Sequence, residues 1–366
     1  ILLLTVATLI VIVALLVSGL RLVLPQLDAW RPQLLEKIST LTGTPVDASQ
    51  ITASWQNFGP TLDVRDIQVG LKDGGKMAVK RVTLALDVWQ SLLHMRWQFR
   101  DLTFWQLQVH TNTPIQTNDG GESLKTDRIS DLFLRQFDHF TLRDSHLSFL
   151  TISGQRAELA VPQLTWLNGR NRHRAEGQLS LSSLTGQHGV MQVRMDLRDE
   201  DGLLNKGRVW LQADDIDVKP WLGRWMQDNI ALKSARFSLE GWMTIEKGDV
   251  ASGDVWLKKG GASWQGDDEV HHLSVDNLTA HLSHDKQSWG FYIPDTRIAI
   301  DDKPWPSGAL AMAWIPAQDV GGDDHQRSDE LRIRASNLTL SGLSGLQPFA
   351  DKLAPSLGEL WRTTQP

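Results

Sequence analysis

The pattern of apolar and polar residues divides the chain into an N-terminal apolar run and a much longer part with strand-like alternation. The run extends from Ile1 to Leu24, and its only charged residue is Arg21. About 20 apolar residues in a helix cross the roughly 30 Å hydrocarbon core of a bilayer. We therefore expect a transmembrane anchor over residues 1–24, with anchor residues Leu2, Leu3, Leu4, Ile10, Ile12, Leu15, Leu16 and Leu20.

A cleaved signal peptide is the alternative to this anchor. The apolar core of a signal peptide is about 7–15 residues long and ends at a site of small residues. This run is longer, and the segment from Arg21 to Pro25 is a poor cleavage site, so the anchor is favoured. The chain does not begin with Met, and we expect a short cytosolic head before it. Without that head, flanking charge does not give the orientation.

A second helix is predicted from Asp28 to Leu41, directly after the break at Pro25. Asp28 is the expected N-cap, Pro32 falls in the first turn, and Gly43 is placed to end the helix in the left-handed conformation. The apolar stripe packs into a core on one interpretation. On the other, the helix lies along a bilayer or closes the end of a groove. The stripe consists of Leu27, Trp30, Leu34, Leu35, Ile38 and Leu41.

From Thr44 onward the apolar period changes to two, which is typical of strands with one apolar and one polar face. A short helix is expected at Trp89–His94, and a loop or disordered stretch is expected after Thr113, where Pro, Asn, Asp and Gly gather. The predicted strands of this half are Ile51–Trp55, Leu62–Val69, Met77–Asp87, Gln98–His110 and Phe137–Leu150.

The alternation is most regular in the second half and predicts a mainly antiparallel sheet. Its apolar face packs against a second sheet if the fold is a compact sandwich. In a long curled sheet, the same face would hold a ligand with long alkyl chains. The face is aliphatic and Met-rich, and few helices are available to cover it, so the groove is favoured. Trp210, Trp242 and Trp256 fall on the opposite face. The residues expected to line it are Met191, Val193, Met195, Leu197, Val209, Leu211, Phe237, Leu239, Met243, Ile245 and Ile333.

A weak internal repeat supports a sheet that grows by addition of modules. The apolar positions of residues 208–218 match those of residues 330–340. Each copy is followed by a predicted short helix, at Trp221–Ile230 and at Leu346–Leu353.

Composition and motifs argue against several function classes. The net charge is −6, so a nucleic-acid partner is not expected, and the absence of Cys removes disulfides, thiolate catalysis and Cys-ligated zinc. We expect no metal and no cofactor. The His residues at 271, 272, 281 and 284 are interpreted as surface residues, the paired acids at 214–215, 267–268, 301–302 and 323–324 as turn acids, and Gly260–Gly261 as a turn. No nucleophile, metalloprotease or phosphate-binding motif is present, so an enzyme is not expected.

A family resemblance rests on the order of several segments. The apolar run is followed by LLEKISTLTGTPV, ITASW, LDVRDIQV, VKRVTLALDVWQSLL and FRDLTFWQLQV. This succession resembles the N-terminal region of the AsmA-like family of Gram-negative bacteria, and in particular its large members related to TamB. The likeness is clearest over residues 1–110.

The resemblance implies an inner-membrane, single-pass protein with most of the chain in the periplasm. It implies a mainly β fold in which an elongated, curled sheet with an apolar groove carries phospholipids between the inner and outer membranes and so maintains the outer-membrane barrier. The expected organisation is an anchor at 1–24, an AsmA-like helix and first strands at 25–113, a loop at 114–126, and a repeated-strand groove segment at 127–366 of a longer chain. Envelope proteins at either end are possible partners. The alternative is a non-enzymatic envelope scaffold that binds a protein partner.

Overall fold

The computed structural model is mainly β, as expected, and divides into two units. Unit 1 comprises Ile1–Thr113, Leu124–Phe149 and Leu159–Gly177, and unit 2 comprises Pro114–Ser123, Leu150–Glu158 and Gln178–Pro366. The structure describes residues 14–15, 17–19, 21–56, 59–70, 75–94, 98–114, 132–150, 156–182, 189–200, 202–219, 232–266, 269–285, 288–315, 330–337 and 363.

The N-terminal part of unit 1 is helical. Residues 21–23 continue into the 3₁₀ helix η1 (Leu24–Trp30), so the helix type changes one residue before Pro25, and α2 (Arg31–Thr42) follows. Within the described part of the chain, we find no helix of the length and apolarity needed to span a bilayer. Of the expected anchor residues, Leu15 alone lies inside the described ranges, where it is helical and exposed.

The start of α2 differs from the prediction, whereas its end agrees. Pro32 lies in the first turn, and Gly43 ends the helix with a φ of 70°, both as expected. The N-cap position is taken by Trp30 and not by Asp28, because the 3₁₀ turn occupies the preceding residues. The Asp28 carboxylate instead accepts a hydrogen bond from the Ile51 backbone N–H at 3.0 Å and pairs with Arg31 at 3.5 Å, so it ties the helical segment to the first long strand.

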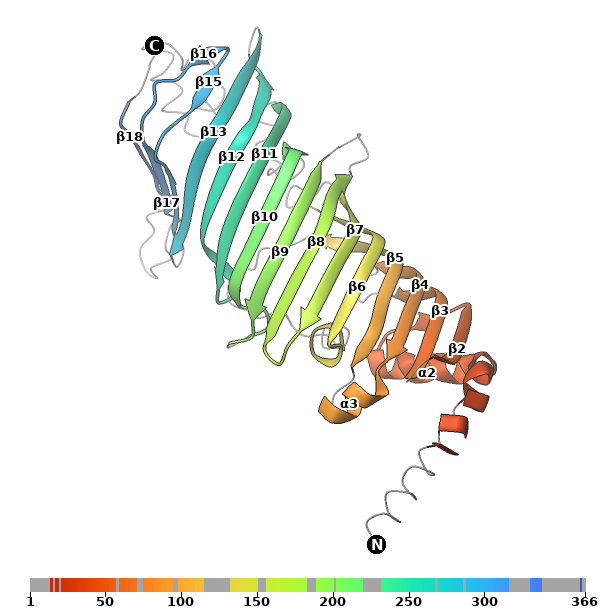
Figure 1. Ribbon diagram of the computed structural model, residues 1–366. Coiled ribbons are helices and arrows are strands. Elements are labelled where there is room, and N and C mark those ends of the chain that lie inside the picture. The colour runs from red at the N-terminus through yellow and green to blue at the C-terminus, as the bar shows by residue number, and fades with distance from the viewer. Residues whose placement is uncertain are drawn as a thin grey trace, which may run out of the picture. The chain divides into compact units, whose positions relative to one another are not determined.

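The strands of unit 1 agree with the predicted ranges to within a few residues, and the short helix is confirmed (Figure 1). Strands β1 to β5 pair antiparallel: β1 and β2 each pair with β3, β3 pairs with β4, and β4 pairs with β5. The predicted loop lies outside the described residues apart from Pro114, which ends β5. The elements are β1 (Val46–Asp47), β2 (Gln50–Gln56), β3 (Gly59–Gly70), β4 (Lys76–Leu86), α3 (Val88–His94), β5 (Phe99–Pro114), a π turn η2 (Leu132–Gln136), β6 (His139–Leu150), β7 (Arg156–Asn168) and β8 (Arg172–Ser182).

An aromatic cluster packs within unit 1. The ring centroid of Phe133 on η2 lies 5.2 Å from Phe104 of β5, 5.1 Å from Phe140 of β6 and 5.5 Å from Phe137. The Asn168 side-chain amide donates to the carbonyls of Phe133 and Phe137 at 2.7 and 2.9 Å, which fixes η2 against the strands. The turn therefore stabilises the core here through edge-to-face ring contacts.

Unit 2 is an antiparallel array, which confirms the predicted strand direction for the pairs that the structure describes. Neighbouring strands from β9 to β13 pair in sequence order, β13 then pairs with both β14 and β15, and β17 joins β14 to β18. The elements are β9 (Val190–Arg198), β10 (Lys206–Asp217), β11 (Leu232–Glu246), β12 (Asp249–Gln265), β13 (Val270–Asp285), β14 (Ser288–Ile293), β15 (Ile298–Ile300), β16 (Lys303–Pro304), β17 (Leu310–Ile315) and β18 (Glu330–Ala335). Strands β10 and β18 begin the two repeat copies, whereas the two predicted repeat helices lie outside the described residues.

Two turn predictions in unit 2 are wrong. Gly260–Gly261 lies inside β12, where a Cβ on Gly260 would stand 2.4 Å from the Arg236 carbonyl oxygen of β11. The glycines are there because adjacent strands approach closely, a known use of glycine within strands. Asp214–Asp215 lies inside β10, at a register shift between Ala213 and Ile216, and not in a turn. Asp301–Asp302 does form a turn, between β15 and β16.

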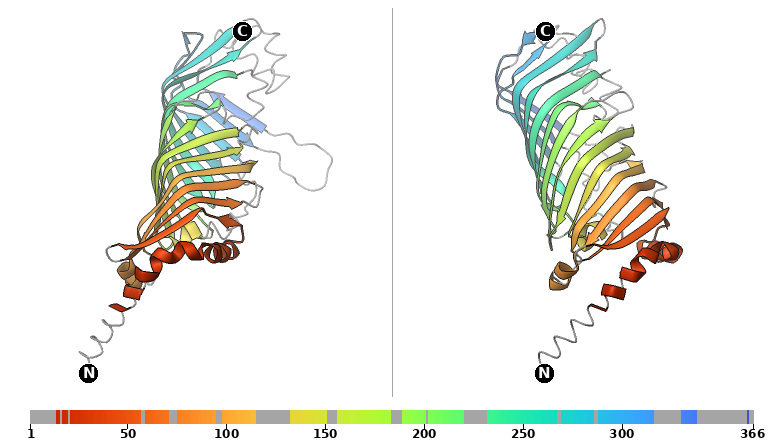
Figure 2. Two further views of the ribbon diagram at one scale, coloured as in Figure 1. Left: turned by 90° about the vertical axis from the view of Figure 1, so that its right-hand side faces the viewer. Right: turned by 45° about the vertical axis from the view of Figure 1, so that its right-hand side comes forward.

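Bulges interrupt the strict alternation in both units. Five residues inside strands have left-handed φ values near 50–57°: Asp66, Gln106, Asp144, Asp215 and Asn277. Asp215 lies at a shift of register between β10 and β11. A bulge of that kind leaves one extra residue on its strand, bends the strand and increases its twist. Figure 2 shows the long strands of each unit bending along their length.

Candidate functional site

The expected lining residues of unit 2 come together in rows across neighbouring strands. Val209 of β10 lies opposite Met195 of β9 and Met243 of β11. Facing residues of antiparallel strands project to the same side of the sheet and contact each other. The rows therefore form one apolar face. The remaining rows of these three strands are Val193–Leu211–Gly241, Met191–Ala213–Leu239 and Leu197–Gly207–Ile245, with Phe237 opposite Ile216.

The row through Val209 continues across the later strands of unit 2, including residues that the sequence reasoning did not select. Through Met243 it reaches Gly253 of β12 and Leu282 of β13, and it ends at Ile333 of β18. The signal for the missed residues was the same period-two alternation, continued through β12 to β17. The missed large side chains on this face include Val255, Leu257, Leu278, Leu282, Trp289, Phe291, Ile293, Leu310, Met312 and Trp314.

Burial varies along the face. Val275, Leu278, Ala280 and Ile293 form a buried cluster, against which Phe237 packs. Most of the expected lining residues in β9 to β11 are only partly buried, and Ile333 is 56% exposed. Apolar surface left in contact with water costs about 25 cal/mol per Å². A partly exposed, continuous apolar face is thus suited to an apolar ligand or partner.

Two glycines on this face are covered by neighbouring side chains. A Cβ at Gly241, which lies directly opposite Leu211, would meet the Asp254 carbonyl oxygen at 3.4 Å and a Val255 methyl at 3.6 Å. The Met243 Cγ would lie 3.5 Å from a Cβ at Gly253. Both glycines are buried, so the neighbouring side chains close the apolar face over them.

The opposite face of unit 2 is polar and carries Trp210, Trp242 and Trp256, as predicted. The indole of Trp210 donates to Glu240 at 3.1 Å and lies under the Arg194 guanidinium at 5.1 Å. Lys258 pairs with Glu240 at 3.0 Å and lies 5.1 Å from the ring centroid of Trp256. Lys258, and then the Trp210 indole, hold the pKa of Glu240 below its usual value. This face keeps its charges paired and in water, so the sheet of unit 2 is amphipathic.

The His residues of unit 2 do not converge. His271 bonds Asp301 at 2.8 Å, His281 bonds Asp254 at 2.5 Å, and the ring of His284 stacks on Trp289 at 4.1 Å. In the described part of the chain, no group of three or more His, Asp or Glu residues is arranged to hold a metal ion.

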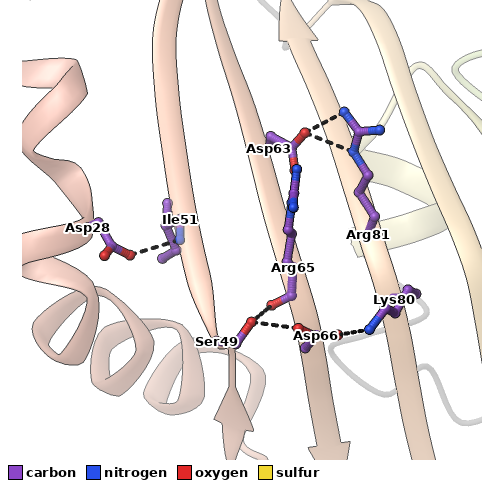
Figure 3. Close-up of polar contacts among 8 residues, drawn as sticks. All are labelled: Asp28, Ser49, Ile51, Asp63, Arg65, Asp66, Lys80 and Arg81. Carbon is purple, nitrogen blue, oxygen red and sulfur yellow. Dashed lines mark hydrogen bonds and ion pairs between the residues drawn. The ribbon is translucent and has the colours of Figure 1, made fainter.

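In unit 1, a polar network crosses β2 to β4 (Figure 3). The Asp63 carboxylate accepts a hydrogen bond from Arg81 at 2.8 Å and lies 3.5 Å from Arg65, so it bridges two like charges on facing strands. Asp66, at the bulge, accepts hydrogen bonds from Lys80 and Ser49, each at 2.7 Å. Lys80, followed by Ser49, holds the pKa of Asp66 below its usual value. The network stabilises the register on both sides of the bulge.

The apolar side of unit 1 contains a pocket of about 530 Å³. Its apolar wall is the row Val46–Val69–Met77 across β1, β3 and β4, and the charged side chains of Asp47 and Lys76 also line it. The pocket gives unit 1 an apolar recess with charged groups nearby.

Comparisons with known proteins agree with the expected resemblance. A family model described as "YhdP protein" matches residues 1–366. The chain is also 73% identical over 366 residues to the "Intermembrane phospholipid transporter YhdP" of Escherichia coli (strain K12). That alignment covers 100% of this chain and 29% of the relative, so the chain spans less than a third of the relative's length. No solved structure matches the chain.

Proposed function

The chain belongs to the YhdP family, and from this premise we propose that it forms the inner-membrane end of a protein bridge that carries phospholipids between the inner and outer membranes. The E. coli relative, described as an intermembrane phospholipid transporter, supports this assignment. The proposed role is non-enzymatic, because transfer along a surface makes and breaks no covalent bond.

The observation that carries the proposal is the continuous apolar face of unit 2. Its rows run from Met195 through Val209 and Met243 to Ile333, and the polar face on the other side is charged. We propose that the sheet is curled around this face to form a groove for acyl chains. The register shift at Asp215 of β10 supports that curvature, because a bulge bends its strand.

The mechanism is physical. Exposing an acyl chain to water costs about 0.8 kcal/mol per CH₂ group, which makes free transfer of a two-chain lipid prohibitively slow. A continuous apolar groove keeps the chains covered at every step. The charged headgroup remains at the open edge in water, so the large cost of desolvating a charge is avoided.

The proposed placement is an inner-membrane protein with one membrane pass at residues 1–24 and the rest of the chain in the periplasm. The apolar run from Ile1 to Leu24 supports this placement, since it has the length that a bilayer requires. Proteins of the envelope would bind at either end of the bridge, and transport would maintain the outer-membrane barrier.

Native mass spectrometry of the chain released from detergent tests the proposal. We expect bound phospholipid in the unaltered chain and its loss in Leu239→Glu, which places a carboxylate in the Met191–Ala213–Leu239 row. Both proteins keep the same N-terminal segment, so lipid held there cancels in the comparison. Equal phospholipid occupancy in the two proteins, with Leu239→Glu still folded, would contradict the proposal.

A further inference from the structure

The short helix α3 connects β4 to β5 and is firmly held in place. Asp87 accepts a hydrogen bond from the Gln90 backbone N–H at 2.9 Å, as an N-cap does. The Ser91 hydroxyl accepts from the Gln98 backbone N–H at 2.9 Å, and the Asp87 N–H donates to the Gln98 carbonyl at 2.8 Å. The Ser91 side of α3 therefore faces the protein.

The apolar side of α3 faces outward. Trp89, Leu92 and Leu93 are 60, 66 and 76% exposed. They are spaced i, i+3 and i+4, so they form one stripe on the helix. A helix of a soluble domain buries such a stripe and exposes its serine, whereas α3 does the reverse.

A second exposed apolar group lies at the same end of unit 1. Leu22, Val23 and Trp30, which precede or belong to η1, are 75, 42 and 54% exposed. Figures 1 and 2 show α3 and η1 at the same end of unit 1, with α3 beyond the ends of β4 and β5 and η1 beside β2. Two elements distant in sequence thus present aromatic and aliphatic side chains in the same region.

We propose that α3 is a membrane-docking element that inserts Trp89, Leu92 and Leu93 into the headgroup–acyl boundary of the bilayer. Amphipathic helices bind there through a buried apolar face, and Trp is favoured at that depth. The helix α3 contains no acidic residue and ends at His94. The two neighbouring carboxylates are already engaged, Asp87 by the Gln90 N–H and Asp28 of η1 by the Ile51 N–H and by Arg31.

The bilayer is the occupant that the chain itself indicates. The apolar run Ile1–Leu24, long enough to cross a bilayer, leads directly into η1. A docked α3 would give unit 1 a second attachment beside that run. The first strands would then be held at the lipid surface, where phospholipids must leave the bilayer. The inference rests on the membrane placement in the proposed function.

A depth-resolved fluorescence experiment tests this. The chain has no Cys, so Leu93→Cys creates a single attachment site for an environment-sensitive dye. Gln108→Cys is the matched control: it is exposed on β5 and lies roughly 30 Å along that strand from its start near α3. The labelled chains are reconstituted into vesicles of phosphatidylethanolamine and phosphatidylglycerol, with or without bromine on the acyl chains.

We expect the dye at residue 93 to shift to the blue and to be quenched several-fold more by brominated lipid than the dye at residue 108. Replacing Trp89 and Leu92 by Ser should reduce that quenching. Equal quenching at both sites, or a blue shift without lipid quenching because another protein copy covers α3, would overturn the proposal. Flotation with the vesicles establishes membrane attachment, and no lipid transfer is measured, so a failed α3 prediction is distinct from a failure of the transport proposal.

Discussion

A charge placed on the apolar face of unit 2 should stop lipid from occupying it. Val193 lies opposite Leu211, with Met191 and Met195 as its nearest neighbours on the same face of β9. Val193→Glu replaces an apolar contact by a carboxylate that an acyl chain must desolvate. A buried polar group without a partner costs about 1–3 kcal/mol, and a charged group costs more.

The magnitude follows from two contributions. Loss of the valine contact removes about 1 kcal/mol of apolar burial from the bound lipid, since full burial of such a side chain contributes roughly 1.5–3 kcal/mol. Adding about 2 kcal/mol for desolvation gives about 3 kcal/mol. Because each 1.4 kcal/mol is a factor of ten, the binding constant for the lipid should fall about a hundredfold, and its occupancy should fall accordingly.

Folding should survive this substitution. Val193 is only partly buried, so the new carboxylate can reach water when no lipid is bound. The matched control is Gln192→Glu, which adds the same charge one residue away, on the exposed polar face opposite Gln212. We expect this control to keep full occupancy.

The assay combines native mass spectrometry for lipid occupancy with transfer of a fluorescent phospholipid from vesicles that hold the chain. Circular dichroism and thermal unfolding establish that both variants are folded. If Val193→Glu retained normal occupancy and transfer, or if Gln192→Glu lost as much as Val193→Glu, the charge argument would be refuted.

Three further predictions concern stability. Gly260→Ala should destabilise unit 2 by roughly 1–3 kcal/mol, because the new Cβ would stand 2.4 Å from a carbonyl oxygen. Gly241→Ala is the control and should be tolerated, because the atom nearest to its new Cβ is 3.4 Å away. Thermal unfolding of the two variants distinguishes these outcomes. The hydrogen bond to Asp138 raises the pKa of His139. The pair therefore stabilises the fold fully below the unfolded pKa of about 6.5, and this stabilisation is lost as pH rises through the folded pKa. The free energy of unfolding, measured from about pH 6 to about pH 8, should show this loss in the unaltered chain and not in His139→Gln. Lys258 lowers the pKa of Glu240. The contribution of this pair to the free energy of unfolding is therefore present above the unfolded pKa and is lost as pH falls through the folded pKa. Acid unfolding of Lys258→Met with the same pH profile as the unaltered chain would contradict this.

Much of the secondary structure was predictable because alternation is strong in this chain. The predicted strand Ile51–Trp55 lies within β2. The predicted helix Trp89–His94 begins one residue after the observed start of α3 at Val88 and ends at the same residue. Strands of an amphipathic sheet repeat every two residues, so the sequence alone indicates one apolar face from Met191 to Leu197.

The bulges were not predicted, although the sequence contains a signal for them. Apolar positions on either side of a bulge are three apart, as in Val64–Ile67, Ala213–Ile216 and Val275–Leu278, with a polar residue of left-handed φ between them. Asp and Asn tolerate this conformation better than most residues. Reading Asp214–Asp215 as a turn missed this, because a turn and a bulge favour the same residue types.

Contacts between distant segments account for the other errors. The sequence offers no local signal for the aromatic cluster, because Phe104 of β5 meets Phe133 and Phe140 only in the folded chain. Asp28 is a plausible cap in sequence, yet β2 supplies a nearer donor through Ile51. Gly260 looked like a turn residue, because the close approach of a neighbouring strand is not visible in a local pattern.

Site-specific photocrosslinking tests the central claim most directly. A photoreactive residue is placed at Val193, Leu211 or Leu239 on the apolar face, and at Arg194 or Gln212 on the polar face, and the adducts are identified by mass spectrometry. Phospholipid adducts from the first three positions and none from the other two are the predicted result. Adducts confined to protein at all five positions would mean that the apolar face is covered by polypeptide, and would contradict the lipid groove.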